Sequence, residues 1–329
     1  MKLWLRLVLG GAMIALLSMG IGLGWLWNEN KPSPDRGTVQ VTIPSGEALA
    51  ITAGRLQDLR IIRSAVLFKL VVQLSGGSKA FPLGTFAVPS GMSALGLAQW
   101  FRTSTPIQVR VTIPEGWTAT KIARLLEEKQ VVGSAQFLDK VRADSLEGTL
   151  FPDTYLFPLG ASAEEVVRVL VRNFAEKTSP LTGGLDPQSL HNGIVMASII
   201  EREYRVTDEA PLIGSVFWNR LQRGIPLASC ATIEYILTEI QGRPHPKRIF
   251  FVYTQIESAF NTYLHKGLPP QPICNPGLTA LKAAFQPAKS EYLYFVVADP
   301  GKGSHRFSSS YADHERAREQ YLNTYISKS

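Results

Sequence analysis

Cysteine is scarce in this chain, which has two, Cys230 and Cys274, among 329 residues. The two do not form a CxxC pair, and none of the five histidines lies in an HExxH sequence. Both patterns are typical of zinc sites, because proteins hold zinc mainly with thiolate and imidazole ligands at short spacings. The sequence therefore predicts no metal site.

Long basic runs are also missing, although the chain is basic as a whole. The formal net charge of +7 and the pI near 9.4 favour an anionic partner such as nucleic acid, anionic lipid or an acidic polymer, or reflect a surplus of ordinary surface lysines. No basic run exceeds two residues, and neither a helix-turn-helix pattern nor an aromatic RNA-binding sequence is present. We therefore expect no nucleic-acid partner.

Charge is absent from the segment Leu7 to Trp27. This apolar run has about 21 residues, enough to cross a hydrocarbon core of ~30 Å as an α-helix. A cleaved signal peptide is the alternative, but the run is long for one and no small-x-small cleavage site follows it. The sequence thus predicts an uncleaved transmembrane helix at residues 7–27 and, because no cysteine lies near its end, no lipoprotein.

The charges that flank this segment predict its orientation. Lys2 and Arg6 precede it, so the positive-inside rule places residues 1–6 in the cytoplasm and the chain after Asn28 outside. The prolines within residues 28–37 predict a juxtamembrane linker. We expect a single-pass protein of the cell (inner) membrane, with most of the chain extracytoplasmic.

A short motif recurs beyond the linker. Val41-Thr-Ile-Pro-Ser-Gly46 returns as Val111-Thr-Ile-Pro-Glu-Gly116, and residues 84–91 have a similar form. Each copy predicts a β-branched strand, a Pro-Gly break and then an amphipathic helix, so residues 38–113 are expected to form a small LysM-like α+β domain. Such domains commonly bind N-acetylglucosamine polymers. A stalk that sets the height of the next domain is an equally open interpretation.

The remaining part, residues 114–329, contains an apolar segment from Ile194 to Ile200 that predicts a buried helix, because every face of it is apolar. The helix meets Glu201, which lies above Ala197 and Ser198 at 3.6 residues per turn. Burial and the negative end of the helix dipole both raise the pKa of a carboxyl, so an acid here stays protonated near neutrality, as a general acid must. The alternative is that Glu201 only marks the point where the helix reaches solvent.

Six short sequence motifs, called words below, follow one another along the chain. They are Glu147–Tyr155 (EGTLFPDTY), Ala197–Glu203 (ASIIERE), Val216–Leu221 (VFWNRL), Thr232–Tyr235 (TIEY), Asn261–Tyr263 (NTY), and Gly267–Pro270 (GLPP) with Pro276-Gly277. Together they resemble the MltG (YceG-like) family of membrane-anchored endolytic murein transglycosylases, over nearly the whole chain after the first ~35 residues. The resemblance implies an α+β fold in which residues 114–329 form a mixed α/β catalytic domain, with Glu201 on its buried central helix as the catalytic acid.

The resemblance also implies a substrate cleft lined by polar side chains. The candidate substrate-binding residues are Glu147, Tyr155, Asn219, Arg220, Thr232, Tyr235, Asn261 and Tyr263. Amide and guanidinium groups can hold the hydroxyl and acetamido groups of a saccharide. Two alternatives stay open: Tyr155 is a core residue, and Arg220 forms a salt bridge with Glu201 or Glu203 that lowers the pKa of the acid.

The reaction implied by the resemblance is cleavage of peptidoglycan glycan strands between N-acetylmuramic acid and N-acetylglucosamine, leaving a 1,6-anhydro-muramyl end. Glu201 would act as acid and then as base, so one carboxyl suffices and no metal or cofactor is needed. Peptidoglycan synthases are expected neighbours. The alternatives are a non-catalytic, membrane-anchored scaffold that binds the cell wall, and a hydrolase that uses Glu147 or Glu203 as a second carboxyl.

The sequence departs from the family in one loop, where Ser229-Cys-Ala-Thr232 replaces a common Asp-Pro before the threonine. The second cysteine lies in the word Pro272-Ile-Cys-Asn-Pro276. The resemblance places both loops beside one cleft, and an exported chain meets an oxidising compartment. We therefore expect a disulfide between Cys230 and Cys274.

Overall fold

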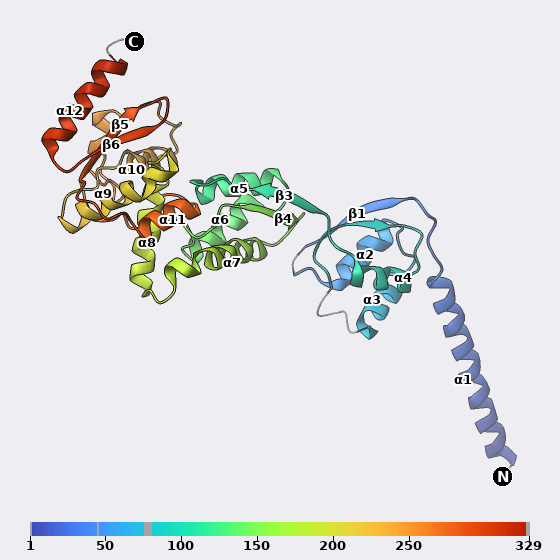
Figure 1. Cartoon of the computed structure of the whole chain (residues 1–329). Helices are drawn as coiled ribbons and strands as arrows, with labels where there is room; N and C mark the ends of the chain where they lie inside the picture. Colours follow the sequence, from blue (N-terminus) through green and yellow to red (C-terminus); the bar gives the residue numbers. More distant parts are fainter. Residues whose placement is uncertain (1, 45, 76–80, 327–329) are drawn as a thin grey trace. The chain divides into compact units, whose positions relative to one another are not determined.

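The computed structural model describes residues 2–44, 46–75 and 81–326, which form two compact units (Figure 1). The first unit comprises residues 1–109 and 156–162, and the second comprises residues 110–155 and 163–329. The fold is mixed α+β, as predicted, and its described strands pair as three two-stranded sheets.

The chain begins with a long apolar helix, α1 (Lys2–Glu29). Within it, Val8–Glu29 is long and apolar enough to cross a membrane, and none of that window is buried inside the protein. Because an apolar helix exposed on all sides is unfavourable in water, a bilayer is the environment that suits it. The predicted apolar helix is therefore present, and its topology stays a prediction.

The first unit folds around one antiparallel strand pair. β1 runs beside β2 in a register from Thr38 opposite Pro89 to Ile43 opposite Gly84. Alternate residues of both strands point into a core that contains the rings of Phe68, Phe86 and Phe101. The elements of this unit are β1 (Thr38–Ile43), α2 (Leu49–Asp58), α3 (Ala65–Leu74), β2 (Gly84–Pro89) and α4 (Ala94–Thr103).

The boundaries between the two units fall within two strands, β3 (Gln108–Thr112) and β4 (Thr154–Pro158). These two strands pair with each other. In the second unit, α5 (Ala119–Glu128) packs on α6 (Ser134–Ala143), and α6 packs on α7 (Ala163–Thr182). The elements that follow are α8 (Pro187–Ile200), η2 (Thr207–Glu209), α9 (Ala210–Gln222), α10 (Cys230–Tyr235), η3 (Ile236–Ile240), η4 (Phe251–Gln255), α11 (Leu278–Phe285), β5 (Tyr294–Asp299), β6 (Ser304–Ser308), α12 (Tyr311–Tyr321) and η5 (Leu322–Ile326).

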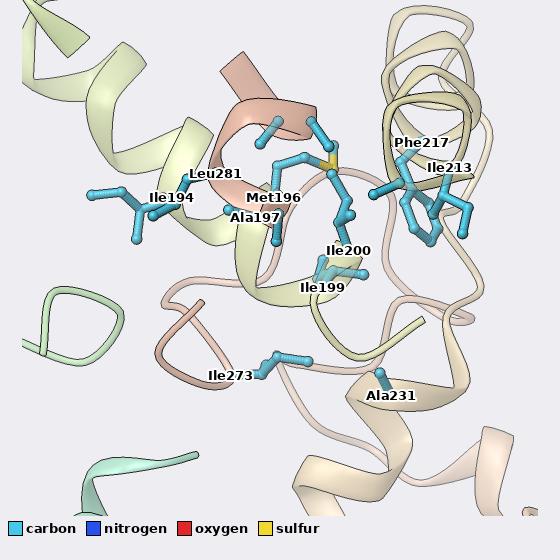
Figure 2. Packing of buried hydrophobic residues seen from close by; sticks show 14 of the residues in the cluster. Ile194, Met196, Ala197, Ile199, Ile200, Ile213, Phe217, Ala231, Ile273 and Leu281 are labelled. Carbon is cyan, nitrogen blue, oxygen red and sulfur yellow. The ribbon is translucent and has the colours of Figure 1, made fainter. Parts of the chain in front are cut away.

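Helix α8 is the centre of the second unit. It starts at Asp186, whose carboxylate accepts from the Gln188 and Ser189 amides at 3.0 Å, and it is buried from Gly193 to Ile200. Figure 2 shows its apolar side chains packed against residues of α9, α11 and the neighbouring loops. The last turn of α8 is thus fixed by core packing on several sides, and this positions whatever follows Ile200.

Candidate active site

Glu201 is the first residue after α8, and its amide donates to the Ala197 carbonyl at 2.8 Å. The side chain is half-buried. Its Oε2 atom accepts from the Gly277 amide at 2.9 Å and from the Tyr204 hydroxyl at 3.5 Å. The carboxyl is therefore held by the protein at the end of a buried helix.

The surroundings of Glu201 favour its neutral form. Burial raises the pKa of the carboxyl to about 7, and repulsion from Glu115 adds to the rise. The Gly277 amide, the Tyr204 hydroxyl and the Arg202 charge act in the opposite direction. The Arg202 guanidinium is engaged by the Glu234 carboxylate and the Gly116 carbonyl. A large part of the Glu201 population consequently carries a proton at neutral pH.

A second half-buried carboxyl belongs to Glu147. Both of its oxygens accept from the Ala119 amide at 3.1 Å, and Oε1 also accepts from the Asn275 side chain at 2.7 Å. Burial raises its pKa to about 7, with repulsion from Glu239 as a further cause. The next residue is Gly148 at φ +89°, where a Cβ atom would lie 2.6 Å from the Pro272 ring, so the loop requires glycine there.

The segment from Asn275 to Gly277 contacts both carboxyls. Asn275 is fully buried, and its Oδ1 accepts from the Gly148 and Leu150 amides at 2.9 Å. Its Nδ2 donates to the Trp117 carbonyl at 3.0 Å and to Glu147. Two residues later, Gly277 donates to Glu201. One short loop therefore positions partners for both acids.

A pocket of about 330 Å³ lies beside Glu147. Its lining includes the side chains of Tyr235, Glu239 and Gln271 and the start of α5 at Thr118. The volume falls at the lower end of the range that small-molecule pockets occupy. Of the predicted substrate-binding residues, the structure brings Glu147 and Tyr235 together at this pocket.

Three other predicted residues use their amide or hydroxyl groups to hold the backbone. Asn219 Nδ2 donates to the carbonyls of Ser290 and Tyr292 at 2.8 and 2.9 Å. Asn261 is fully buried and donates to the carbonyls of Thr254 and Ile256, and Thr232 is fully buried with its hydroxyl donating to the Ser229 carbonyl at 2.8 Å. In the described structure these three side chains therefore bind backbone carbonyls, and their contact with a saccharide stays a prediction.

Tyr155 is buried, and its hydroxyl donates to the Phe151 carbonyl at 2.6 Å. This arrangement matches the alternative in which Tyr155 is a core residue. Tyr263 lies beside Cys230, with its hydroxyl 3.1 Å from the thiol. Both side chains thus contact protein groups in the described structure.

Arg220 does not form an ion pair with Glu201 or Glu203 within the described residues. Its guanidinium lies 5.5 Å from the centre of the Tyr294 ring, and burial lowers its pKa. Glu203 instead accepts from the Ser229 hydroxyl, and burial raises the Glu203 pKa. The salt bridge that would have lowered the pKa of the catalytic candidate is therefore not formed by Arg220.

The predicted disulfide is wrong, because Cys230 and Cys274 are both free thiols. Cys274 is fully buried, and its thiol donates to the Ser198 carbonyl of α8 at 3.2 Å. Cys230 is exposed and contacts Tyr263. Each thiol thus has its own local partner, and burial raises the pKa of Cys274 well above its ordinary value.

Three residues beside the acids were not among the predicted site residues: Glu115, Asn275 and Gly277. Pro276-Gly277 is part of the last sequence word, so the sequence contained a signal for this loop. No local pattern indicated that Glu115 faces Glu201, since the two are 86 positions apart in the chain.

The fold and the site together define an α+β protein whose second unit holds a half-buried carboxyl, with a raised pKa, at the end of a buried helix. The model of the YceG-like family matches residues 41–320. The chain therefore belongs to the YceG-like family, as the sequence words predicted.

Individual relatives agree with this assignment. An endolytic murein transglycosylase of Bacillus subtilis (strain 168) is 29% identical, with 92% of this chain and 91% of the relative covered. One of Streptococcus pneumoniae serotype 2 is 25% identical, and the match covers 94% of this chain but only 64% of that longer protein. The crystal structure of a putative yceG-like protein of Listeria monocytogenes is similar with a TM-score of 0.55 and 26% identity, covering 85% of this chain and 98% of that one.

Proposed function

We propose that this protein is a lytic transglycosylase that cleaves the glycan strands of peptidoglycan internally, between N-acetylmuramic acid and N-acetylglucosamine. The observation that carries the proposal is the Glu201 carboxyl, half-buried after α8, with a pKa of about 7. The names of the relatives, endolytic murein transglycosylases, support the choice of substrate.

The proposed reaction uses one carboxyl twice. Since Oε2 of Glu201 accepts from Gly277 and Tyr204, Oε1 is the oxygen that carries the proton. Oε1 protonates the glycosidic oxygen, and the bond from that oxygen to C1 of the muramyl residue breaks. The resulting carboxylate accepts the proton of the muramyl 6-hydroxyl, whose oxygen bonds to C1. The acid is regenerated, no water is consumed, and the product is a 1,6-anhydro end.

The loop of Asn275 and Gly277 provides the electrostatic support for these steps. The Gly277 amide stabilises the carboxylate that forms after proton transfer, because hydrogen bonds to an ionised acceptor are stronger than those to a neutral one. Glu147, Tyr235 and Gln271 line the adjacent pocket, where hydroxyl and acetamido groups of the strand would bind. In this proposal α1 anchors the enzyme in the cell membrane and both units lie outside the cytoplasm.

The experiment is digestion of purified glycan strands by the full-length protein in detergent, with products identified by mass spectrometry. Wild-type protein should release fragments with 1,6-anhydro-muramyl ends. Glu201→Gln should abolish release, because an amide cannot donate and recover the proton, whereas the neighbouring Glu203→Gln should retain much of the activity. Reducing ends in place of anhydro ends would indicate a hydrolase, and intact strands with wild-type protein would indicate a scaffold.

A further inference from the structure

An unusual surface spans residues 240–252, from the last residue of η3 to the first two residues of η4. Four large hydrophobic side chains here point into solvent: Ile240, Phe250, Phe251 and Val252 are 50%, 54%, 81% and 67% exposed. Single exposed hydrophobic residues are common on soluble proteins, but a cluster of this kind on one short segment marks a surface that contacts something apolar. We call these residues the 240–252 surface.

The charge of the 240–252 surface has one sign. Arg243, Lys247 and Arg248 are exposed, and none of them forms an ion pair with any residue in the described ranges. The Arg248 guanidinium lies 5.9 Å from the centre of the Phe250 ring. The sequence has no acidic residue from Ile240 to Ile256. Exposed apolar side chains and unpaired cations thus share one short segment, and in one case, Arg248 and Phe250, they lie in contact.

The base of this surface is firmly packed. Ile249, Tyr253 and Ile256 lie against the buried side chains of Ile233, Ile236 and Leu237. The Arg243 amide donates to the Leu237 carbonyl at 2.9 Å, and His245 lies 2.8 Å from the Glu234 carboxylate. Because the inward-facing residues are held in place, the outward-facing Phe250, Phe251 and Val252 are presented by a folded support.

A lipid surface fits this combination best. Phenyl and valyl side chains enter the boundary between headgroups and acyl chains, while lysine and arginine bind lipid phosphate. The same chain carries a helix, Val8–Glu29, that is long and apolar enough to cross a bilayer. A bilayer is therefore the apolar phase to which this helix would attach the rest of the chain. We propose that the 240–252 surface docks on an anionic lipid bilayer.

Docking would also affect the candidate active site. The Glu234 carboxylate contacts both His245 of the surface and Arg202, the residue after Glu201. A bilayer contact at 240–252 would therefore hold Glu201 within a short distance of the membrane, so that the proposed cleavage takes place close to the lipid surface. This consequence rests on the proposed function, whereas the docking itself does not.

The test uses the full-length chain in proteoliposomes with a polarity-sensitive fluorophore on Phe251→Cys, in a Cys230→Ser background. Cys274 is fully buried and does not compete for the label. Ser309→Cys, also at an exposed position, provides the matched control label. Vesicles contain phosphatidylethanolamine with phosphatidylglycerol, or phosphatidylcholine alone, and brominated lipids serve as quenchers.

In anionic vesicles the label at 251 should shift to shorter emission wavelengths and lose at least half its intensity to brominated lipid, while the label at 309 should do neither. High salt, phosphatidylcholine vesicles or the triple change Arg243→Glu, Lys247→Glu and Arg248→Glu should reverse the effect. Emission typical of water at position 251 in anionic vesicles would overturn the proposal. A shift to shorter wavelengths without quenching by brominated lipid would indicate a protein partner or second copy, and one that requires added glycan strands would indicate a saccharide surface. Either result would also overturn it.

Discussion

Asn275→Ala tests how the loop beside the acids controls Glu201. The side chain is fully buried and makes four hydrogen bonds, two from backbone amides and two to carbonyl or carboxyl oxygens. Each contributes about 1 kcal/mol on average, and unpaired buried groups cost more, so we expect unfolding to become easier by about 3–5 kcal/mol. Without these side-chain contacts the loop should hold the Gly277 amide less firmly on Glu201, although the backbone bonds of Asn275 to Trp117 and Gly116 remain.

The effect on activity has a defined sign. A general acid must be protonated, so cleavage should decline as pH rises through the Glu201 pKa of about 7. The Gly277 amide lowers that pKa, because it stabilises the carboxylate. Its loss should move the alkaline midpoint upward. A hydrogen bond to a charged group is worth about 1.5–3 kcal/mol, which for a half-buried carboxyl predicts a shift of about 1 pH unit.

The other groups that face Glu201 do not reverse this expectation. Glu115 raises its pKa, Arg202 and Tyr204 lower it, and the buried thiol of Cys274 is neutral across the working range because its own pKa is raised. Of these groups, none is hydrogen-bonded to the Asn275 side chain. The predicted shift therefore comes from the Gly277 amide.

The assay is the pH dependence of glycan cleavage by full-length protein, alongside thermal unfolding. The control is Asn261→Ala, which also removes a fully buried asparagine with hydrogen bonds to backbone groups. It should lower stability with the alkaline midpoint unchanged. Asn275→Ser serves if the alanine variant does not fold. An unchanged midpoint in a folded Asn275 variant, or equal shifts in both asparagine variants, would refute the reasoning.

Two further predictions concern stability. Glu147→Gln should raise the melting temperature relative to wild type more at pH 8 than at pH 5. Because the pKa of Glu147 is raised to about 7 in the folded protein, the stability that this carboxyl contributes is fully present below its unfolded-state pKa and is lost as pH rises through the folded-state pKa. The loss is at most about 3 kcal/mol. A difference independent of pH would contradict the burial of this carboxyl. Gly193→Ala should destabilise by about 1–3 kcal/mol in denaturant unfolding, because its Cβ would lie 2.1 Å from the Phe285 ring, whereas Gly54→Ala, with nothing within 4 Å, should be neutral or stabilising. Equal effects of the two changes would contradict the close packing of α8 on α11.

The central helix could be predicted because its signal is local. An uninterrupted apolar run such as Ile194–Ile200 has few stable solutions other than burial, and the structure buries all of it. The start of the helix also has a local signal, because Asp186 is a favourable N-cap residue and Pro187 is favourable in the first turn. The apolar run predicts the helix only from Ile194, whereas the capping residues start it at Pro187.

The surroundings of the acids depend on contacts between distant parts of the chain. Asn275 pairs through its backbone with Trp117 and through its side chain with Gly148, which are 158 and 127 positions away. Neither contact has a local sequence signal, because hydrogen bonds across a fold depend on how helices pack. The position of Glu201 at a helix end was predictable, and the Gly277 donor that tunes it was not.

Asparagine and threonine show why a binding role is harder to predict from residue type than the burial of a carboxyl at the end of an apolar helix. The amide of Asn219 has the chemistry to bind a saccharide, but the same chemistry binds backbone carbonyls, and in the fold it binds those of Ser290 and Tyr292. A buried carboxyl has no such common structural use, because burial without a cation disfavours its charge. Glu201 and Glu147 are both half-buried, accept hydrogen bonds from backbone amides and have raised pKa values, and their roles in catalysis and binding stay predictions.

The two cysteines extend this contrast. Their number, the expected compartment and a resemblance that places both loops beside one cleft argued for a disulfide, yet none of these specifies the distance between the thiols. Cys274 lies inward against α8, where its thiol meets the Ser198 carbonyl, while the neighbouring Ile273 amide donates to the Ser198 hydroxyl at 3.0 Å. These two contacts attach the 272–277 loop to the helix that ends at Glu201. The loop is thereby positioned by hydrogen bonds to α8, without a covalent bond to the loop of Cys230.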